Sequence, residues 1–212
     1  MISTKELQLL PDCKPLQAAC KAMAVLDAIL SQDWVYRYHS YNCAWSEEEE
    51  FFEMRNGEGD QLLILFKAEG VVINGFSSSA EPPQKDEATS GLPEIFHEFI
   101  FGEPVNSAGT TFCVWKLTDG KWNTGMLVPD DNYSAELLSP LDGNPETYLH
   151  WALNYFKGSY REDGIPPELV AAIFNGELLT KEMILSVVEQ LEDWDLLKED
   201  LEEISYPYHI YN

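Results

Sequence analysis

The spacing of apolar side chains near the start of the chain predicts a helix. Asp12 is a candidate N-cap, because an aspartate can accept hydrogen bonds from the free backbone N–H groups of a first turn. Pro15 falls in that turn, where proline is tolerated. Lys21 and Asp27 lie off the apolar stripe. The stripe recurs at intervals of one turn and consists of Leu16, Ala19, Cys20, Met23, Leu26 and Leu30.

From Trp34 the pattern changes to aromatic and β-branched residues interrupted by turn signals, which is typical of consecutive strands. The predicted strands are residues 34–41, 50–55, 61–66 and 71–76. Short connections that contain glycine, NGEGD and KAEG, favour hairpins. The sheet is therefore expected to be antiparallel.

The stretch from Phe76 to Gly91 is rich in Ser, Pro and acidic residues and has no apolar periodicity. It predicts a surface loop, either a plain connection or a mobile lid. The segment LPEIFHEFIF that follows predicts a short helix with Leu92, Phe96 and either Phe99 or Ile100 turned inward.

Asp119-Gly120 predicts a tight hairpin, because this dipeptide readily adopts the backbone of a type I′ turn. The flanking segments TTFCVWKLT and KWNTGMLV would then be its two strands. The face that they share is mostly apolar and is expected to meet the core. The cross-strand pairs expected on it are Leu117 with Trp122, Trp115 with Thr124 and Cys113 with Met126.

The rest of the chain predicts helices at residues 145–156, at residues 166–176 and in a long segment that begins at Thr180. The apolar stripe of the long helix comprises Ile184, Val187, Val188, Leu191, Trp194, Leu197 and Leu201. These elements indicate an α+β fold, with a mostly antiparallel sheet of about six strands, an N-terminal helix and C-terminal helices packed on the sheet. We expect an α+β domain over residues 1–160 and a C-terminal helical segment over residues 161–212, packed on the same domain.

The composition combines a strong acidic excess with a large apolar content. The 212 residues include 37 Asp and Glu but 13 Lys and Arg, which gives a formal charge of -24. Disordered acidic chains lack apolar residues. Here 45% of the residues are hydrophobic and 12% are aromatic, so the chain is expected to fold.

We expect neither a signal peptide nor a membrane span from this sequence. It opens MISTKELQLLPDC, without the apolar region of a signal peptide, and the apolar run from Leu62 to Phe66 is far shorter than the roughly 20 residues of a membrane span. The four cysteines, Cys13, Cys20, Cys43 and Cys113, lack CxxC spacing. We expect reduced, mostly buried thiols in a cytoplasmic protein, in preference to a disulfide or a zinc site.

The acidic excess is unevenly distributed. Residues 1–33 carry a net charge of -1, residues 34–150 carry -14 and residues 151–212 carry -9, so the first helix is expected to be the least exposed. Two concentrations stand out, the run from Glu47 to Glu50 and the acidic face of the last helix, either as solvated faces or as sites for a basic partner. The candidate partner-binding residues are Glu47, Glu48, Glu49, Glu50, Asp193, Asp195, Glu199 and Asp200.

Few residues suggest catalysis or a bound cofactor. The four histidines, His39, His97, His150 and His209, belong to no metal-binding or nucleophile motif. His97 beside Glu98 is the acid–base candidate, with an ordinary surface histidine as the alternative, whereas His150 beside Trp151 is expected to be partly buried and structural.

Other ligand sites are also weakly indicated. Asp130, Asp131 and Asn132 could hold a divalent cation but lack the spacing of a calcium loop, so no metal site and no cofactor are predicted. The chain has neither a glycine-rich phosphate loop nor the cationic stripe that nucleic acids require. The aromatic tail from Tyr206 to Tyr211 is expected to dock on the domain, or to form part of an interface.

The residues Leu92, Pro93, Phe96 and Phe99 form an LPxxFxxF pattern, which resembles a segment of SUKH-type bacterial immunity proteins. These are α+β proteins that neutralise toxins. In that family the segment lies close to the N-terminus, whereas here it begins at residue 92. The resemblance implies a binding protein and assigns no functional residue.

The charge and the lack of catalytic motifs together predict a cytoplasmic protein-binding module that neutralises or regulates a basic partner. A toxin nuclease or another nucleic-acid-binding protein would be such a partner. The alternatives are a small hydrolase that uses dispersed carboxylates together with His97, and an acidic structural domain whose charge serves solubility. The oligomeric state stays open.

Overall fold

The computed structural model describes residues 1–81, 83–126 and 133–211. Its main element is a six-stranded antiparallel sheet in which strands follow one another in chain order, from β1 to β6. The α+β fold and the sheet of six strands confirm the sequence prediction. The strands are β1 (His39–Ser46), β2 (Glu49–Arg55), β3 (Gln61–Lys67), β4 (Gly70–Phe76), β5 (Phe112–Leu117) and β6 (Asn123–Thr124).

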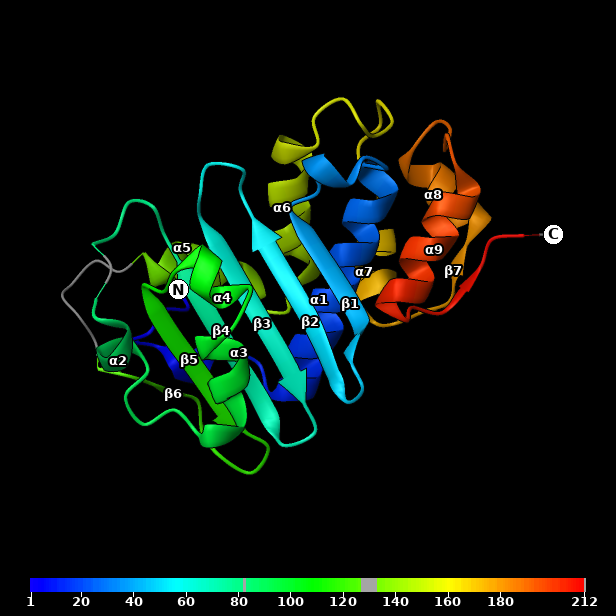
Figure 1. The fold of residues 1–212 in the computed structure, drawn as a ribbon. Helices are drawn as coiled ribbons and strands as arrows, with labels where there is room; N and C mark the ends of the chain where they lie inside the picture. Colours follow the sequence, from blue (N-terminus) through cyan, green and yellow to red (C-terminus); the bar gives the residue numbers. More distant parts are fainter. Residues whose placement is uncertain (82, 127–132, 212) are drawn as a thin grey trace.

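Helices cover the two faces of the sheet unequally, and Figure 1 shows this arrangement. One face packs on α1 (Cys13–Leu30), α5 (Ser134–Leu138), α6 (Pro145–Tyr155), α7 (Pro167–Phe174) and α8 (Lys181–Val187). The opposite face carries α2 (Lys85–Ala88), α3 (His97–Phe101) and α4 (Val105–Ala108), which gather near β4 and β5. The last helix, α9 (Trp194–Ile204), lies beside the edge strand β1.

Short 3₁₀ helices connect several of these elements. They are η1 (Leu7–Leu9), η2 (Trp34–Tyr36), η3 (Glu94–Phe96) and η4 (Ser139–Leu141). In the described ranges, no helix combines the length and the apolarity needed to cross a bilayer.

The first helix is the central one, as its near-neutral charge predicted. Every residue from Ala22 to Leu30 is buried, and α1 contacts β1, α7 and α9. Asp27, which lies off the apolar stripe, is also fully buried. Neighbouring elements therefore surround this helix on several sides, and its apolar stripe alone does not describe its packing.

The middle strands of the sheet are buried on both faces. Leu62, Ile64 and Phe66 of β3 join the core under α1, whereas Leu63 and Leu65 join a second apolar cluster on the side of α3. A strand that is covered on both faces is apolar throughout, because successive side chains point in opposite directions. This explains the uninterrupted run from Leu62 to Phe66.

The first predicted strand, residues 34–41, is wrong at its start. Trp34–Tyr36 forms the 3₁₀ helix η2, in which the Asp33 carboxylate accepts a hydrogen bond from the Val35 N–H at 3.1 Å. The strand proper begins at His39 and continues to Ser46. Aromatic residues favour strands in general, but here a capped turn precedes the strand.

The predicted two-residue hairpin at Asp119-Gly120 is also wrong. Trp115 pairs with Asn123, not with Thr124, so the connection is longer and the register differs by one residue. The Trp122 indole donates a hydrogen bond to the Pro11 carbonyl at 3.0 Å, which holds this residue next to α1 and away from a cross-strand pair. Leu117, expected in the core, is exposed.

Of the other residues expected on the apolar face of this hairpin, only some are buried as predicted. Cys113 and Trp115 are buried, as expected, in the cluster on the side of α3. Met126 is exposed. Met126 lies beyond the end of β6 at Thr124, and the shift of one residue means that it is not the residue opposite Cys113.

Two further helix boundaries differ from the prediction. The long helix expected from Thr180 is two helices, α8 and α9, separated by residues 188–193. Asp193 caps the second helix, because its carboxylate accepts hydrogen bonds from the N–H groups of Asp195 and Leu196, both at 3.0 Å. The loop expected between Phe76 and Gly91 contains the short helix α2.

The aromatic tail docks on the domain, as predicted. The Tyr206 hydroxyl donates to the carbonyls of Ile173 and Glu177, each at 2.9 Å, and the residue is buried. Beyond it, β8 (Tyr208–His209) pairs in parallel with β7 (Leu179–Thr180). The C-terminal segment is thereby tied to α7 and to the start of α8.

Gly75 in β4 provides a test of the packing between β4 and β5. A Cβ atom at this position would lie 2.1 to 2.6 Å from three ring carbons of Phe112. We expect Gly75→Ala to lower the free energy of unfolding by about 1–3 kcal/mol, as for other overpacked cores. Urea unfolding would measure the loss. Adding Phe112→Leu should recover part of it, and an unchanged midpoint for Gly75→Ala would contradict this packing.

Candidate functional site

A cleft of about 180 Å³ lies between the edge strand β1 and α9. On the face of the sheet that carries α3 and α4, no helix of the described chain covers β1 (Figure 1). The cleft therefore opens where the sheet ends. Four regions of the chain supply its walls, namely Ala24 of α1, residues 34–45, β2 and the second half of α9.

An internal ion pair fixes one wall of the cleft. The Arg37 guanidinium donates to both carboxylate oxygens of Asp200, at 2.6 and 2.7 Å, and also to the carbonyls of Ser31 at 2.8 Å and Gln32 at 3.2 Å. Arg37 is only 6% exposed. A bidentate contact of this kind is strong and directional, so it fastens α9 to the segment that precedes β1.

Two further carboxylates line the cleft, and among the described residues neither has a close positively charged side chain to neutralise it. Glu53 of β2 has Arg55 as its ion-pair partner at 3.9 Å, a loose separation. Glu203 of α9 has no hydrogen-bond or ion-pair partner in the described part of the chain. With Asp200 balanced by Arg37 and Glu53 loosely paired with Arg55, Glu203 is the carboxylate of the cleft that carries an uncompensated negative charge.

Both of these carboxyl groups are held in an environment that disfavours their charge. Burial raises the pKa of Glu53, and Arg55 offsets only part of that effect. Partial loss of hydration raises the pKa of Glu203, the nearby Asp200 carboxylate raises it further, and Arg37 opposes the shift. A cation that entered the cleft would stabilise the ionised form of each group.

Two exposed tryptophans stand at the rim of the cleft. Trp34 is 51% exposed, and the guanidinium of Arg55 stacks on its ring at 3.4 Å from the ring centroid. Trp45 is 41% exposed and stacks on Phe51, with ring centroids 4.4 Å apart. The contact with Arg55 shows that the Trp34 face accepts a cation.

The size of the cleft restricts what it can hold. Sites for drug-sized ligands usually enclose roughly 300 to 1,000 Å³. At about 180 Å³ the cleft suits a single side chain or a small cation. Its carboxylates and aromatic rim favour a positively charged occupant.

The predicted acidic run from Glu47 to Glu50 divides into two parts. Glu49 and Glu50 are neutralised within the fold. Lys67 donates to Glu49 at 2.5 Å, whereas Lys21 at 2.7 Å and the Tyr41 hydroxyl at 2.8 Å contact Glu50. Although burial opposes its ionisation, the hydrogen bonds from Lys67 and Ser46 lower the pKa of Glu49.

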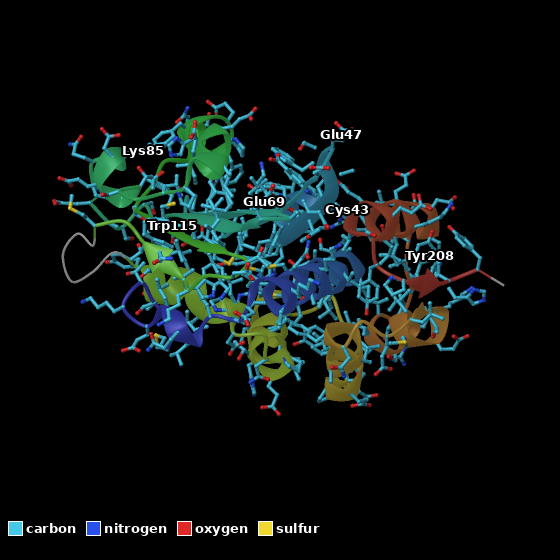
Figure 2. The ribbon with its side chains drawn as sticks, turned by 90° about the horizontal axis from the view of Figure 1, so that it is seen from below. Cys43, Glu47, Glu69, Lys85, Trp115 and Tyr208 are labelled. Carbon is cyan, nitrogen blue, oxygen red and sulfur yellow. The ribbon has the colours of Figure 1, made fainter. Side chains whose placement is uncertain are left out.

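Glu47 and Glu48, in contrast, are exposed and have no hydrogen-bond or ion-pair partner in the described part of the chain. Figure 2 shows Glu47 at the outer end of the turn between β1 and β2, on the side of the molecule that carries α9. These two residues are therefore available to a partner that approaches the cleft.

The predicted acidic residues of the last helix have different roles. Asp193 caps α9, Asp195 accepts a hydrogen bond from the Tyr211 hydroxyl at 2.7 Å, and Asp200 pairs with Arg37. Asp195 raises the pKa of Tyr211 to about 12 through that hydrogen bond. Glu199 is exposed and has no described partner, so it is the member of this group that a ligand could reach unopposed.

A buried Asp–His pair lies at the inner wall of the cleft, where His39 is one of the lining residues. Asp27 Oδ1 lies 3.2 Å from His39 Nδ1, and the Tyr148 hydroxyl donates to the same oxygen at 2.8 Å. Such a pair orients histidines in acid–base catalysts. Here Asp27 and His39 are 0% and 2% exposed, and the rings of Phe52 and Trp151 contact His39, so the pair belongs to the core.

The other three histidines are exposed. His97 is exposed, and its Nε2 lies 3.2 Å from the Leu92 carbonyl oxygen. This placement fits the alternative of an ordinary surface histidine. The expectation that His150 is partly buried is wrong, since the residue is exposed and contacts the Glu146 carbonyl at 2.8 Å, one turn back in α6. His209 is exposed on β8.

The possible metal ligands and the four cysteines are placed as follows. Within residues 1–81, 83–126 and 133–211, no three His, Cys, Asp or Glu side chains gather as a metal site requires. The cation-binding candidates at positions 130–132 lie outside the described residues. Cys20 and Cys113 are buried, and burial raises the pKa of both thiols, whereas Cys13 and Cys43 are partly exposed.

Sequence reasoning missed most of the residues that line the cleft. Glu53 alternates with Phe52 and Met54, and this period of two places it on the face opposite the main core. That signal could have identified it. Trp34 precedes β1 and Trp45 lies near its end, but their exposure depends on where α9 packs, and the sequence alone does not specify that.

Comparison with known proteins identified no relative of this chain. No family model matches the chain, and neither a curated protein nor a solved structure matches it.

Proposed function

We propose that this chain is a protein-binding module that neutralises or regulates a basic partner protein. Its docking surface, the β1–α9 face, would comprise the cleft and the exposed acids around it. The residues of this face are Trp34, Trp45, Glu47, Glu48, Glu53, Glu199 and Glu203.

The observation that carries the proposal is the surplus negative charge in the cleft, beneath an aromatic rim. Glu203 has no ion-pair partner in the described part of the chain, and Glu53 has Arg55 at 3.9 Å, whereas Glu49, Glu50 and Asp200 each have a cation within 2.7 Å. Residues at the centre of protein interfaces are enriched in tryptophan, and complementary charge selects the partner and accelerates its association.

Proteins that bind nucleic acids fit this partner chemistry, because they carry cationic surfaces that neutralise phosphates. A module that covered such a surface would block access of the nucleic acid. The segment that resembles immunity proteins would contribute structurally, since Leu92, Phe96 and Phe99 are buried against the sheet.

Affinity capture with matched variants tests the proposal. The wild-type chain would be immobilised, and bound host proteins would be identified by mass spectrometry at about 0.05 M and about 0.5 M salt. We expect recovery of a basic protein that falls steeply with salt. The site variant Glu47→Gln/Glu48→Gln/Glu203→Gln removes three exposed charges of the β1–α9 face and should lose that protein.

The control variant is Asp119→Asn/Glu162→Gln/Asp163→Asn, which removes three exposed acids that do not line the cleft. It has the same net charge as the site variant and should retain the partner. Equal losses in both variants would show that total charge alone drives capture, and recovery of no basic protein at low salt would overturn the proposal.

A further inference from the structure

We infer that the β1–α9 cleft admits one arginine side chain of the basic partner. This inference rests on the proposed function and specifies how the partner is recognised. The Glu53 and Glu203 carboxylates would receive the guanidinium, and the tryptophans at the rim would pack against its planar face or its stem.

The chain itself illustrates both kinds of contact. Arg37 inserts its guanidinium among polar groups in the same cleft and forms a bidentate pair with Asp200. Arg55 stacks its guanidinium on Trp34. A carboxylate therefore binds one neighbouring arginine and an aromatic ring binds the other. We assign the same two kinds of contact to the arginine of the partner.

The charge and size of the cleft favour one such side chain. Arg37 balances Asp200, and Arg55 lies 3.9 Å from Glu53, so a single added guanidinium would neutralise the one carboxylate that remains, Glu203. A volume of about 180 Å³ leaves room for a side chain but not for a packed helix or strand. The planar guanidinium also suits the tryptophan rim better than the strongly hydrated ammonium of lysine does.

The test titrates the full chain with the peptide acetyl-Gly-Arg-Gly-amide and follows the indole N–H signals of Trp34 and Trp45 by nuclear magnetic resonance. The signals are assigned with Trp→Phe variants. Because one side chain carries the contact, we expect a Kd of about 1 mM. The matched lysine peptide should bind at least about threefold more weakly, and the neutral citrulline peptide should not shift these signals.

Glu53→Gln and Glu203→Gln should each weaken binding of the arginine peptide at least about threefold, and the double variant should abolish it. Glu162→Gln, at an exposed site outside the cleft, should bind as the wild type does. Unchanged thermal midpoints would show that the losses are not caused by misfolding.

Absence of arginine-dependent shifts in the wild type, or equal binding of the citrulline peptide, would overturn the inference. In that case capture of a basic protein that depends on the β1–α9 face would still support the proposed function. Failure of both experiments would remove both proposals.

Discussion

Replacement of Asp27 by alanine is expected to lower the free energy of unfolding by about 3–5 kcal/mol, the usual effect of breaking a buried charged network. Asp27 is fully buried and accepts hydrogen bonds from the N–H groups of Tyr38 at 2.9 Å and His39 at 2.8 Å. It also contacts His39 Nδ1 and the Tyr148 hydroxyl. Alanine would leave all these polar groups without their acceptor.

Urea unfolding followed by circular dichroism measures this effect. Because many domains are stable by only about 5–15 kcal/mol, the variant will have a much lower urea midpoint. Tyr148→Phe is the matched control, since it removes a single hydrogen bond and should cost about 1 kcal/mol. A loss below about 1 kcal/mol for Asp27→Ala would show that the network does not hold α1 against β1.

Replacement of Arg37 by methionine is expected to cost about 3 kcal/mol, because it leaves the Asp200 carboxylate without its buried partner. The Ser31 and Gln32 carbonyls lose a donor as well. Since this arginine fastens α9 beside β1, hydrogen exchange of the α9 amides should accelerate more than that of the α6 amides.

A double-mutant cycle separates the ion pair from the packing of the arginine stem. Asp200→Leu added to Arg37→Met replaces both charged partners by apolar side chains, and such replacements are often close to neutral. The double variant should therefore be more stable than Arg37→Met alone. Simple additivity of the two losses would contradict an energetic coupling between these residues.

The fold was predictable to the extent that local patterns determine it. The apolar stripe from Leu16 to Leu30 and the β-rich runs of β2, β3 and β4 identified their elements directly. The errors occur where distant contacts override local preference. Trp122 is held by the Pro11 carbonyl, which changes the hairpin, and Gln32 hydrogen-bonds with Asp193 at the break between α8 and α9.

The candidate site was less predictable, for a related reason. Charge runs identify acidic segments, but not which acids find internal cations. Lys67 and Lys21 neutralise Glu49 and Glu50, and both pairs form only when the chain has folded. Glu53, by contrast, stands between the buried Phe52 and Met54 in β2, and the cleft it lines is closed by α9 from the far end of the sequence.

The most direct test of the central claim, that basic partners dock on the β1–α9 face, is hydrogen–deuterium exchange of the chain with and without a hexa-arginine peptide. We predict slower exchange in residues 32–46 and in α9, with α6 and α7 unchanged. Protection spread over all acidic segments, or confined to α6 and α7, would contradict the account.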